Sequence, residues 1–137
     1  MAELPEVDVA IAGGGPVGCA FALALSGSGL STARISDDAV PGDRPIALAH
    51  GSRLIMERLG VWSSIRNTPI ETIHVSQQGF GRTVMRCAEL ALPALGYVTS
   101  YSQLTRELGA RTPAVPGMLL DWKVDADGIR LRLSRGA

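Results

Sequence analysis

Six consecutive residues near the N-terminus have types and a spacing that suit the binding of a phosphate-bearing cofactor. They are Gly13, Gly14, Gly15, Pro16, Val17 and Gly18, and they carry the G-x-G-x-x-G pattern of dinucleotide sites. In such a site Gly13 allows a tight turn, Gly15 lets the backbone approach a pyrophosphate, and Gly18 lets a helix lie close to the preceding strand. The N-terminus of that helix would face the phosphates with unpaired N–H groups and a partial positive charge.

Because glycine-rich turns are common, the weight of this pattern depends on the segments that flank it. Residues 7–12 form a short β-branched run with few polar interruptions, which is typical of a buried parallel strand. Ala22 and Leu25 follow at helical spacing, and residues 27–29 end the helix. We therefore predict a strand, a dinucleotide-binding turn and a helix, in preference to an ordinary strand-to-helix turn.

The second strand of this unit is predicted over residues 30–36. In this fold an acidic residue at the end of that strand binds the adenosine ribose. Here Ser36 occupies the position, and Asp37 and Asp38 follow it. We expect Ser36, or Asp37 after a shift of one residue, to contact the ribose. The alternative, that Asp37 and Asp38 are solvated turn residues, stays open.

The rest of the chain changes from helical to strand patterns. It predicts a loop over 40–45, helices over 47–59 and 62–66, a hairpin of strands 73–76 and 83–86, a strand over 95–100, a helix over 103–111, and strands over 118–124 and 129–133. Ser102 is a candidate cap for the helix over 103–111. In the last strand Ile129, Leu131 and Leu133 alternate with arginines, so we expect one buried and one exposed face. The fold class is α/β, with a parallel sheet followed by an antiparallel part.

Composition narrows the class of protein further. The 137 residues are 46% hydrophobic and carry no net charge, which argues for a domain with a real core and against a nucleic-acid partner. The longest apolar segment, near residues 20–25, is too short to cross a bilayer. Cys19 and Cys87 are too few for a disulfide scaffold or a zinc site, and two thiols favour a reducing compartment. We expect a cytoplasmic protein. Peripheral contact with the inner face of the membrane stays open as an alternative.

Five segments together resemble one enzyme family. They are DVAIAGGGPVG, RPIALAHGS, ERLGVW, IETIHVSQQGFG and LGYVTSYSQL. The chain resembles, from Asp8 to about Leu108, the FAD-dependent aromatic hydroxylases of ubiquinone biosynthesis, of the polyprenyl-methoxyphenol hydroxylase type within the para-hydroxybenzoate hydroxylase superfamily. The segments over 44–62 and 70–81 are the most specific.

The resemblance implies a Rossmann-like FAD-binding fold and a monooxygenase that uses NAD(P)H and O2 to hydroxylate a small aromatic substrate, here a polyprenylphenol. It places Arg44 beside the FAD, where a planar guanidinium suits phosphate or ribose oxygens. More loosely, it places Tyr101 and Ser102 near the flavin side. It also implies ubiquinone-biosynthesis proteins as partners. His50 and His74 lack a carboxylate or serine constellation, so we interpret both as structural or surface residues.

The resemblance also predicts a domain organisation. Residues 1–70 would be the first part of the FAD-binding domain, 71–96 the start of the substrate-domain sheet, and 97–137 a return to the FAD-binding domain. The family's later Asp-Gly and Gly-Asp flavin motifs are not found, and Asp127-Gly128 fits a hairpin turn instead. We therefore expect an N-terminal fragment, truncated and inactive alone. Two alternatives stay open: an oxidoreductase that uses another dinucleotide such as NAD(P), favoured by Ser36 and nearby Arg34, and a non-catalytic module.

Overall fold

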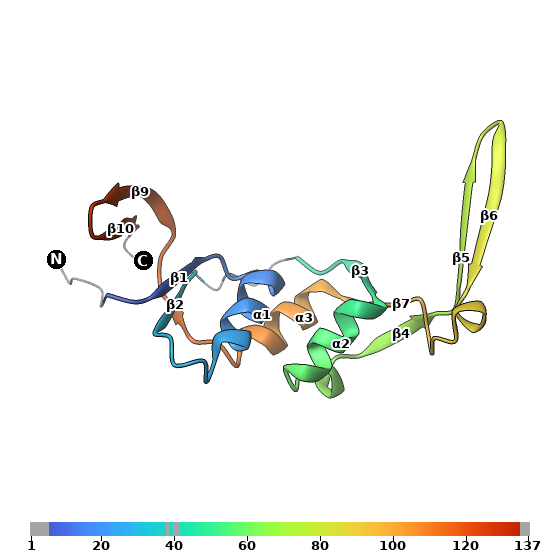
Figure 1. Ribbon diagram of the computed structural model, residues 1–137, viewed down its shortest axis with the longest axis horizontal. Helices are drawn as coiled ribbons and strands as arrows, with labels where there is room; N and C mark the ends of the chain where they lie inside the picture. The colour runs from blue at the N-terminus through green and yellow to red at the C-terminus, as the bar shows by residue number, and fades with distance from the viewer. Residues whose placement is uncertain (1–5, 38, 40–41, 135–137) are drawn as a thin grey trace. The chain divides into compact units, whose positions relative to one another are not determined.

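The computed structural model describes residues 6–37, 39 and 42–134. The chain forms two compact units, one made of residues 1–41 and 105–137 and the other of residues 42–104. Each unit combines helices with sheet, as the ribbon shows (Figure 1). The first unit contains a parallel sheet and the second an antiparallel one, so the mixed α/β class expected from the sequence is confirmed.

The first unit is built on a strand, a helix and a second strand. These are β1 (Val9–Ala12), α1 (Pro16–Leu25) and β2 (Thr32–Ile35), and β1 is parallel to β2. A short strand, β8 (Ala114–Val115), is parallel to β2 on its other side. Ile11, Cys19 and Ile35 are buried where the helix covers the sheet. The predicted strand–turn–helix–strand order is confirmed.

A carboxylate ties the starts of β1 and β2 together. Both the backbone N–H and the hydroxyl of Ser31 donate to the Asp8 carboxylate at 2.7 Å. These two hydrogen bonds lower the pKa of Asp8 below its ordinary value, and the bond from the hydroxyl has the larger effect.

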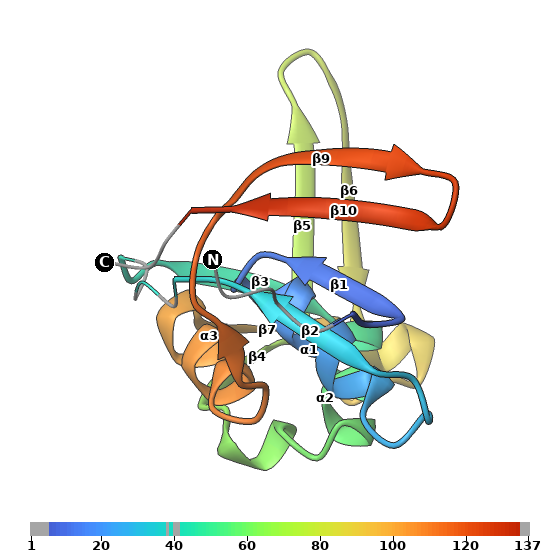
Figure 2. The same cartoon turned by 90° about the vertical axis from the view of Figure 1, so that its left-hand side faces the viewer.

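The same unit carries a two-stranded antiparallel ribbon. It consists of β9 (Leu119–Asp125) and β10 (Gly128–Leu133), which Figure 2 shows side by side. One face carries Leu120, Trp122, Val124, Ile129 and Leu131, and Ile129 is 65% exposed. The strands were predicted correctly, but the expectation that Ile129 is buried is wrong. A lone two-stranded ribbon has no second layer of its own to cover an apolar face.

The second unit is built on an antiparallel sheet in the order β3-β7-β4. Its strands are β3 (Pro45–Ala49), β4 (Asn67–Ile70) and β7 (Gly96–Ser100). The helix α2 (His50–Arg58) follows β3 directly, and the unit also contains two 3-10 helices, η1 (Trp62–Ser64) and η2 (Cys87–Leu90). The prediction of helix from residue 47 is therefore wrong over 47–49. That stretch pairs with β7, from Pro45 opposite Ser100 to Ala49 opposite Gly96, and this pairing overrides a weak helical pattern.

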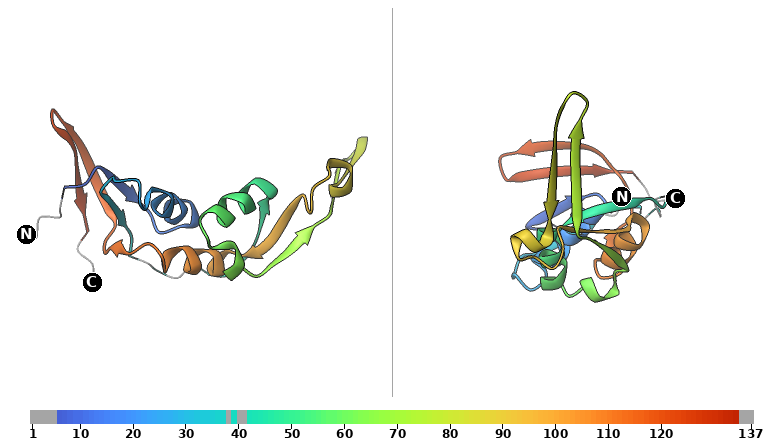
Figure 3. Two further views of the ribbon diagram at one scale, coloured as in Figure 1. Left: turned by 60° about the horizontal axis from the view of Figure 1, so that its bottom comes forward. Right: turned by 90° about the vertical axis from the view of Figure 1, so that its right-hand side faces the viewer.

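The predicted hairpin of the second unit is confirmed. It consists of β5 (Thr72–Gln77) and β6 (Phe80–Arg86), paired antiparallel around Gly79, whose φ is +76°. Figure 3 shows it, in yellow-green, extending away from the sheet of the same unit. Phe80 near its tip is 81% exposed.

The helix α3 (Tyr101–Gly109) starts two residues earlier than predicted. The Ser100 hydroxyl accepts a hydrogen bond from the Gln103 N–H at 3.1 Å, so Ser100 is the N-cap. The expectation that Ser102 caps this helix is wrong. The helix begins directly after β7, which leaves no room for a linker between the strand and the first turn.

Candidate cofactor-binding site

The glycine turn joins β1 to α1 in a conformation that depends on glycine. Gly13 has a φ of +131°, a region that side-chain-bearing residues rarely adopt, and its N–H donates to the Ile35 carbonyl at 2.9 Å. Gly15 is extended and directly precedes α1, whose first residue is Pro16. The first turn of α1 contains no acidic residue. The N-terminus of α1 therefore presents unpaired N–H groups and a partial positive charge, and no carboxylate in the first turn neutralises that charge.

Two further glycines lie where an added side chain would meet close neighbours. A Cβ on Gly18 would lie 2.7 Å from the Gly13 carbonyl oxygen, and one on Gly14 would overlap the Ser36 hydroxyl. The turn is thus pressed against both its own helix and the end of β2. This closely approached backbone is the cradle that a pyrophosphate needs, so the residues present fit a dinucleotide.

The structure brings Ser36 to the glycine turn. Ser36 directly follows β2, is 9% exposed, and donates its N–H to the Val115 carbonyl at 3.1 Å. Asp37 is exposed, and its carboxylate accepts the Ala39 N–H at 3.3 Å in a local turn. Asp38 lies outside the described residues. Ser36 therefore has the better placement of the two candidates for a ribose contact, although that contact stays a prediction.

Arg34 is a feature of this site that the sequence analysis noted only as a neighbour. Its side chain is 3% exposed, and its Nε and Nη2 donate to the Thr112 carbonyl at 2.9 and 2.5 Å. Its Nη1 would lie 3.1 Å from a Cβ on Gly14. The buried guanidinium of Arg34 thus lies next to the glycine turn. An arginine between two apolar residues, Ala33 and Ile35, in a predicted strand was the available signal.

Arg44 lies in the second unit, just before β3. Its carbonyl accepts the Tyr101 N–H at 2.9 Å, and its guanidinium carbon lies 4.5 Å from the centre of the Tyr101 ring. The preceding residue, Asp43, is anchored more strongly. Its carboxylate accepts the hydroxyls of Ser100 at 2.6 Å and Ser102 at 2.8 Å, with the Ser102 N–H at 3.3 Å.

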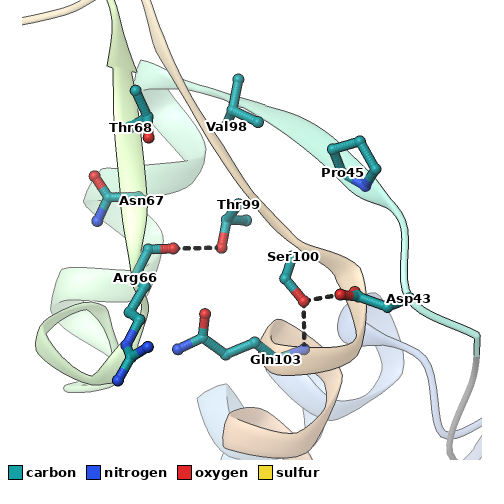
Figure 4. A pocket seen from close by; sticks show the side chains of 9 residues that line it. All are labelled: Asp43, Pro45, Arg66, Asn67, Thr68, Val98, Thr99, Ser100 and Gln103. Carbon is teal, nitrogen blue, oxygen red and sulfur yellow. Dashed lines mark hydrogen bonds between the residues drawn. The ribbon is translucent and has the colours of Figure 1, made fainter.

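An open pocket of about 520 Å³ lies beside the Asp43 carboxylate (Figure 4). It is lined by Asp43, Pro45, Arg66, Asn67, Thr68, Val98, Thr99, Ser100 and Gln103. The Thr99 hydroxyl donates to the Arg66 carbonyl at 2.8 Å, and the Gln103 amide donates to the Ser64 carbonyl at 3.2 Å. The lining combines apolar surface with polar and charged side chains, and it includes one carboxylate, of Asp43, and one guanidinium, of Arg66.

The carboxylate of Asp43 makes the second unit sensitive to acid. Hydrogen bonds from Ser100, and then from Ser102, hold the pKa of Asp43 below its ordinary value. The ionised form therefore stabilises the fold at any pH above the unfolded-state pKa, and this contribution is lost as the pH falls through the folded-state pKa.

We expect the urea midpoint of the native chain to fall more between about pH 5 and about pH 3 than that of Asp43→Asn, because the variant has no such carboxylate to protonate. Asp127→Asn, in the exposed turn between β9 and β10, is the matched control and should fall like the native chain. Equal losses in the native chain and Asp43→Asn would contradict this assignment.

The two histidines lie apart from the glycine turn in the sequence and have different surroundings. His50 begins α2, and its buried Nδ1 has no hydrogen-bond partner among the described residues. His74, in β5, lies 3.1 Å from Arg82 through its Nδ1. Within the described ranges, no three His, Cys, Asp or Glu side chains are grouped so that they could hold a metal ion. Nor does that part of the chain include a helix long and apolar enough to cross a membrane.

Several solved structures have this fold. The rebeccamycin biosynthetic enzyme RebC, soaked with K252c, has a TM-score of 0.70 at 21% identity, over 98% of this chain and 30% of RebC. The p-nitrophenol 4-monooxygenase PnpA from Pseudomonas putida DLL-E4 has a TM-score of 0.68 at 17% identity, over 92% of this chain and 35% of PnpA. These likenesses show that the chain shares its fold with both enzymes.

Among curated proteins the chain is similar to ubiquinone hydroxylases. It is 31% identical to the 3-demethoxyubiquinol 3-hydroxylase of Escherichia coli K12 over 124 residues, which is 82% of this chain and 32% of that protein. It is 39% identical to the ubiquinone hydroxylase UbiM of Neisseria meningitidis over 83 residues, 56% of this chain and 18% of UbiM. The resemblance found in the sequence is confirmed. The chain spans about a third or less of the length of these relatives, and no family model matches it.

Proposed function

We propose that this chain supplies the FAD-binding part of a monooxygenase that hydroxylates a small aromatic intermediate of ubiquinone biosynthesis. One observation carries the proposal: the glycine turn between β1 and α1 is packed so closely that a side chain at Gly18 would meet backbone and one at Gly14 would meet Ser36. The similarity to two ubiquinone hydroxylases supports the choice of substrate class. A polyprenyl tail on the substrate, a cytoplasmic site with peripheral membrane contact, and partners among ubiquinone-biosynthesis proteins belong to the same proposal.

In this proposal β1, α1 and β2 form a Rossmann-like unit, and the glycine turn, residues 13–18, holds the FAD pyrophosphate on backbone N–H groups. Ser36 contacts the adenosine ribose, with Asp37 as the alternative, and Arg44 contacts cofactor oxygens. When bound, FAD supplies the redox chemistry by which NAD(P)H and O2 hydroxylate the ring. The contribution of the chain is to bind and orient the adenosine half of the cofactor. The division into 1–70, 71–96 and 97–137 and inactivity of the chain alone stay predictions.

Arg34 supports NADP(H) as a second candidate ligand. A guanidinium near the ribose end of a dinucleotide site is the group that accommodates the additional phosphate of NADP. Arg34 is buried against the Thr112 carbonyl, which favours a structural role, but its Nη1 faces the glycine turn. Competition between FAD and NADPH for the purified chain separates the two candidates.

Gly15→Val tests the cofactor assignment. A valine side chain at the residue before α1 would stand between the backbone and a pyrophosphate, so we expect the variant to lose FAD binding while it remains folded. Quenching of FAD fluorescence on titration with the purified chain measures binding, and circular dichroism measures folding. Gly81→Val in β6 is the control, since nothing lies within 4 Å of a Cβ there. Unchanged FAD affinity in Gly15→Val, or tighter binding of NADPH than of FAD, would overturn the assignment.

A further inference from the structure

We propose that Tyr101 is a positioning residue for Arg44, holding its guanidinium by stacking so that its N–H groups are directed to the cofactor. The inference rests on the proposed function, because it concerns how Arg44 meets the cofactor. It starts from one distance: the Arg44 guanidinium carbon lies 4.5 Å from the centre of the Tyr101 ring. At this separation the cation lies within the range of a cation–π contact.

The contact leaves the hydrogen-bonding capacity of Arg44 available. A guanidinium carries five N–H donors in its plane, and a ring against its face uses none of them in conventional hydrogen bonds. The Arg44 side chain is exposed, and it makes no hydrogen bond or ion pair with residues 6–37, 39 or 42–134. Stacking thus holds the group in place without a competing carboxylate. Asp43, the adjacent acid, is instead occupied by Ser100 and Ser102.

The backbone around the pair is fixed on both sides. The Tyr101 N–H donates to the Arg44 carbonyl at 2.9 Å, which extends the pairing of β3 with β7 by one residue. Tyr101 is also the first residue of α3, directly after its N-cap. The Asp43 carboxylate holds the first turn of this helix through three hydrogen bonds. The ring and the guanidinium are therefore brought together by the fold and not by a chance meeting of two exposed side chains.

This arrangement predicts a modest and specific effect on binding. A cation–π contact at an exposed site is worth an amount that corresponds to about a two- to fivefold change in affinity. An aromatic ring of another kind should preserve it, whereas an aliphatic side chain of similar volume should not. A merely structural role of Tyr101 in α3 would instead be independent of Arg44.

The test is a double-mutant cycle for FAD binding by the purified chain, read by quenching of flavin fluorescence. Relative to the native chain, Tyr101→Phe should bind FAD equally well and Tyr101→Leu about two- to fivefold more weakly. In an Arg44→Ala background, Tyr101→Leu should have no further effect. If Tyr101→Leu does not fold, as judged by circular dichroism, Tyr101→Met replaces it in the cycle and should show the same loss, whereas Tyr101→Trp should retain native affinity.

The possible outcomes distinguish failure of the role inferred for Tyr101 from failure of the proposed function. An equal loss from Tyr101→Leu with and without Arg44, or a loss in Tyr101→Phe or Tyr101→Trp equal to that expected for Tyr101→Leu, would overturn the positioning role while leaving FAD binding intact. Native affinity in Arg44→Ala would instead remove Arg44 from the cofactor site, and the inference with it. Failure of the native chain to bind FAD would count against the proposed function itself.

Discussion

Gly18→Ala should lower the free energy of unfolding by about 1–3 kcal/mol, the usual cost of forcing extra atoms into a closely packed position. The added Cβ would lie 2.7 Å from the Gly13 carbonyl oxygen and 3.4 Å from Ile11 Cγ2. The first of these contacts is with backbone, which cannot rotate away, so α1 has to move off the sheet. That movement would also displace the N–H groups at the start of the helix, and FAD binding should weaken together with stability.

Gly51→Ala is the matched control for this substitution. Gly51 also lies in the first turn of a helix, α2, and nothing is within 4 Å of a Cβ built there. Alanine should therefore be neutral or should stabilise the chain by up to about 1 kcal/mol, since it is the better helix former. Urea denaturation followed by circular dichroism measures both variants. A loss of stability in Gly51→Ala as large as that in Gly18→Ala would show that close packing of α1 is not the cause.

Arg44→Ala should weaken FAD binding by roughly 1.5–3 kcal/mol, the range for a hydrogen bond that involves a charged group. The structure makes a loss of this size reasonable because the guanidinium is held against Tyr101 and has no hydrogen bond or ion pair with the described residues. Arg44→Lys should recover only part of the loss, because it keeps the charge but lacks the planar fork.

Titration of the purified chain with FAD at constant ionic strength compares these variants. Arg58→Ala, an exposed arginine in the last turn of α2, removes the same charge elsewhere and should bind FAD like the native chain. If Arg58→Ala matched Arg44→Ala, the effect would be one of net charge alone. Equal affinities of the native, alanine and lysine forms at residue 44 would exclude a cofactor contact.

Local patterns were sufficient to predict the part of the site formed by β1, the glycine turn and α1. Here the β-branched run, the glycines and the helical spacing all lie within about twenty residues and agree with one another. The placement of Ser36 followed from the same unit, since it ends the next strand. Prediction worked where neighbours in sequence are neighbours in space.

The features that the sequence did not disclose depend on distant partners. Ala47 to Ala49 form a strand because β7, about fifty residues further on, pairs with them. The role of Asp43 depends on hydroxyls 57 and 59 residues away, and nothing in its own proline- and glycine-rich loop indicates them. Ser100 rather than Ser102 caps α3 because the helix begins as soon as β7 ends. Pairing and capping of this kind are decided by tertiary contacts, which a local pattern does not contain.

The contact between Gly14 and Ser36 also couples the substitutions that can be accepted at these two positions during evolution. A Cβ at residue 14 would overlap the Ser36 hydroxyl and lie 3.0 Å from the Ser36 Cβ. A larger residue 14 therefore requires the Ser36 side chain to move or to become smaller, and Arg34 Nη1, 3.1 Å from that Cβ, must also give way. A smaller residue 36 causes no steric clash but would lose the proposed ribose contact of Ser36, so the two positions are coupled through both packing and binding. Substitutions at residues 14 and 36 are therefore expected to be non-additive.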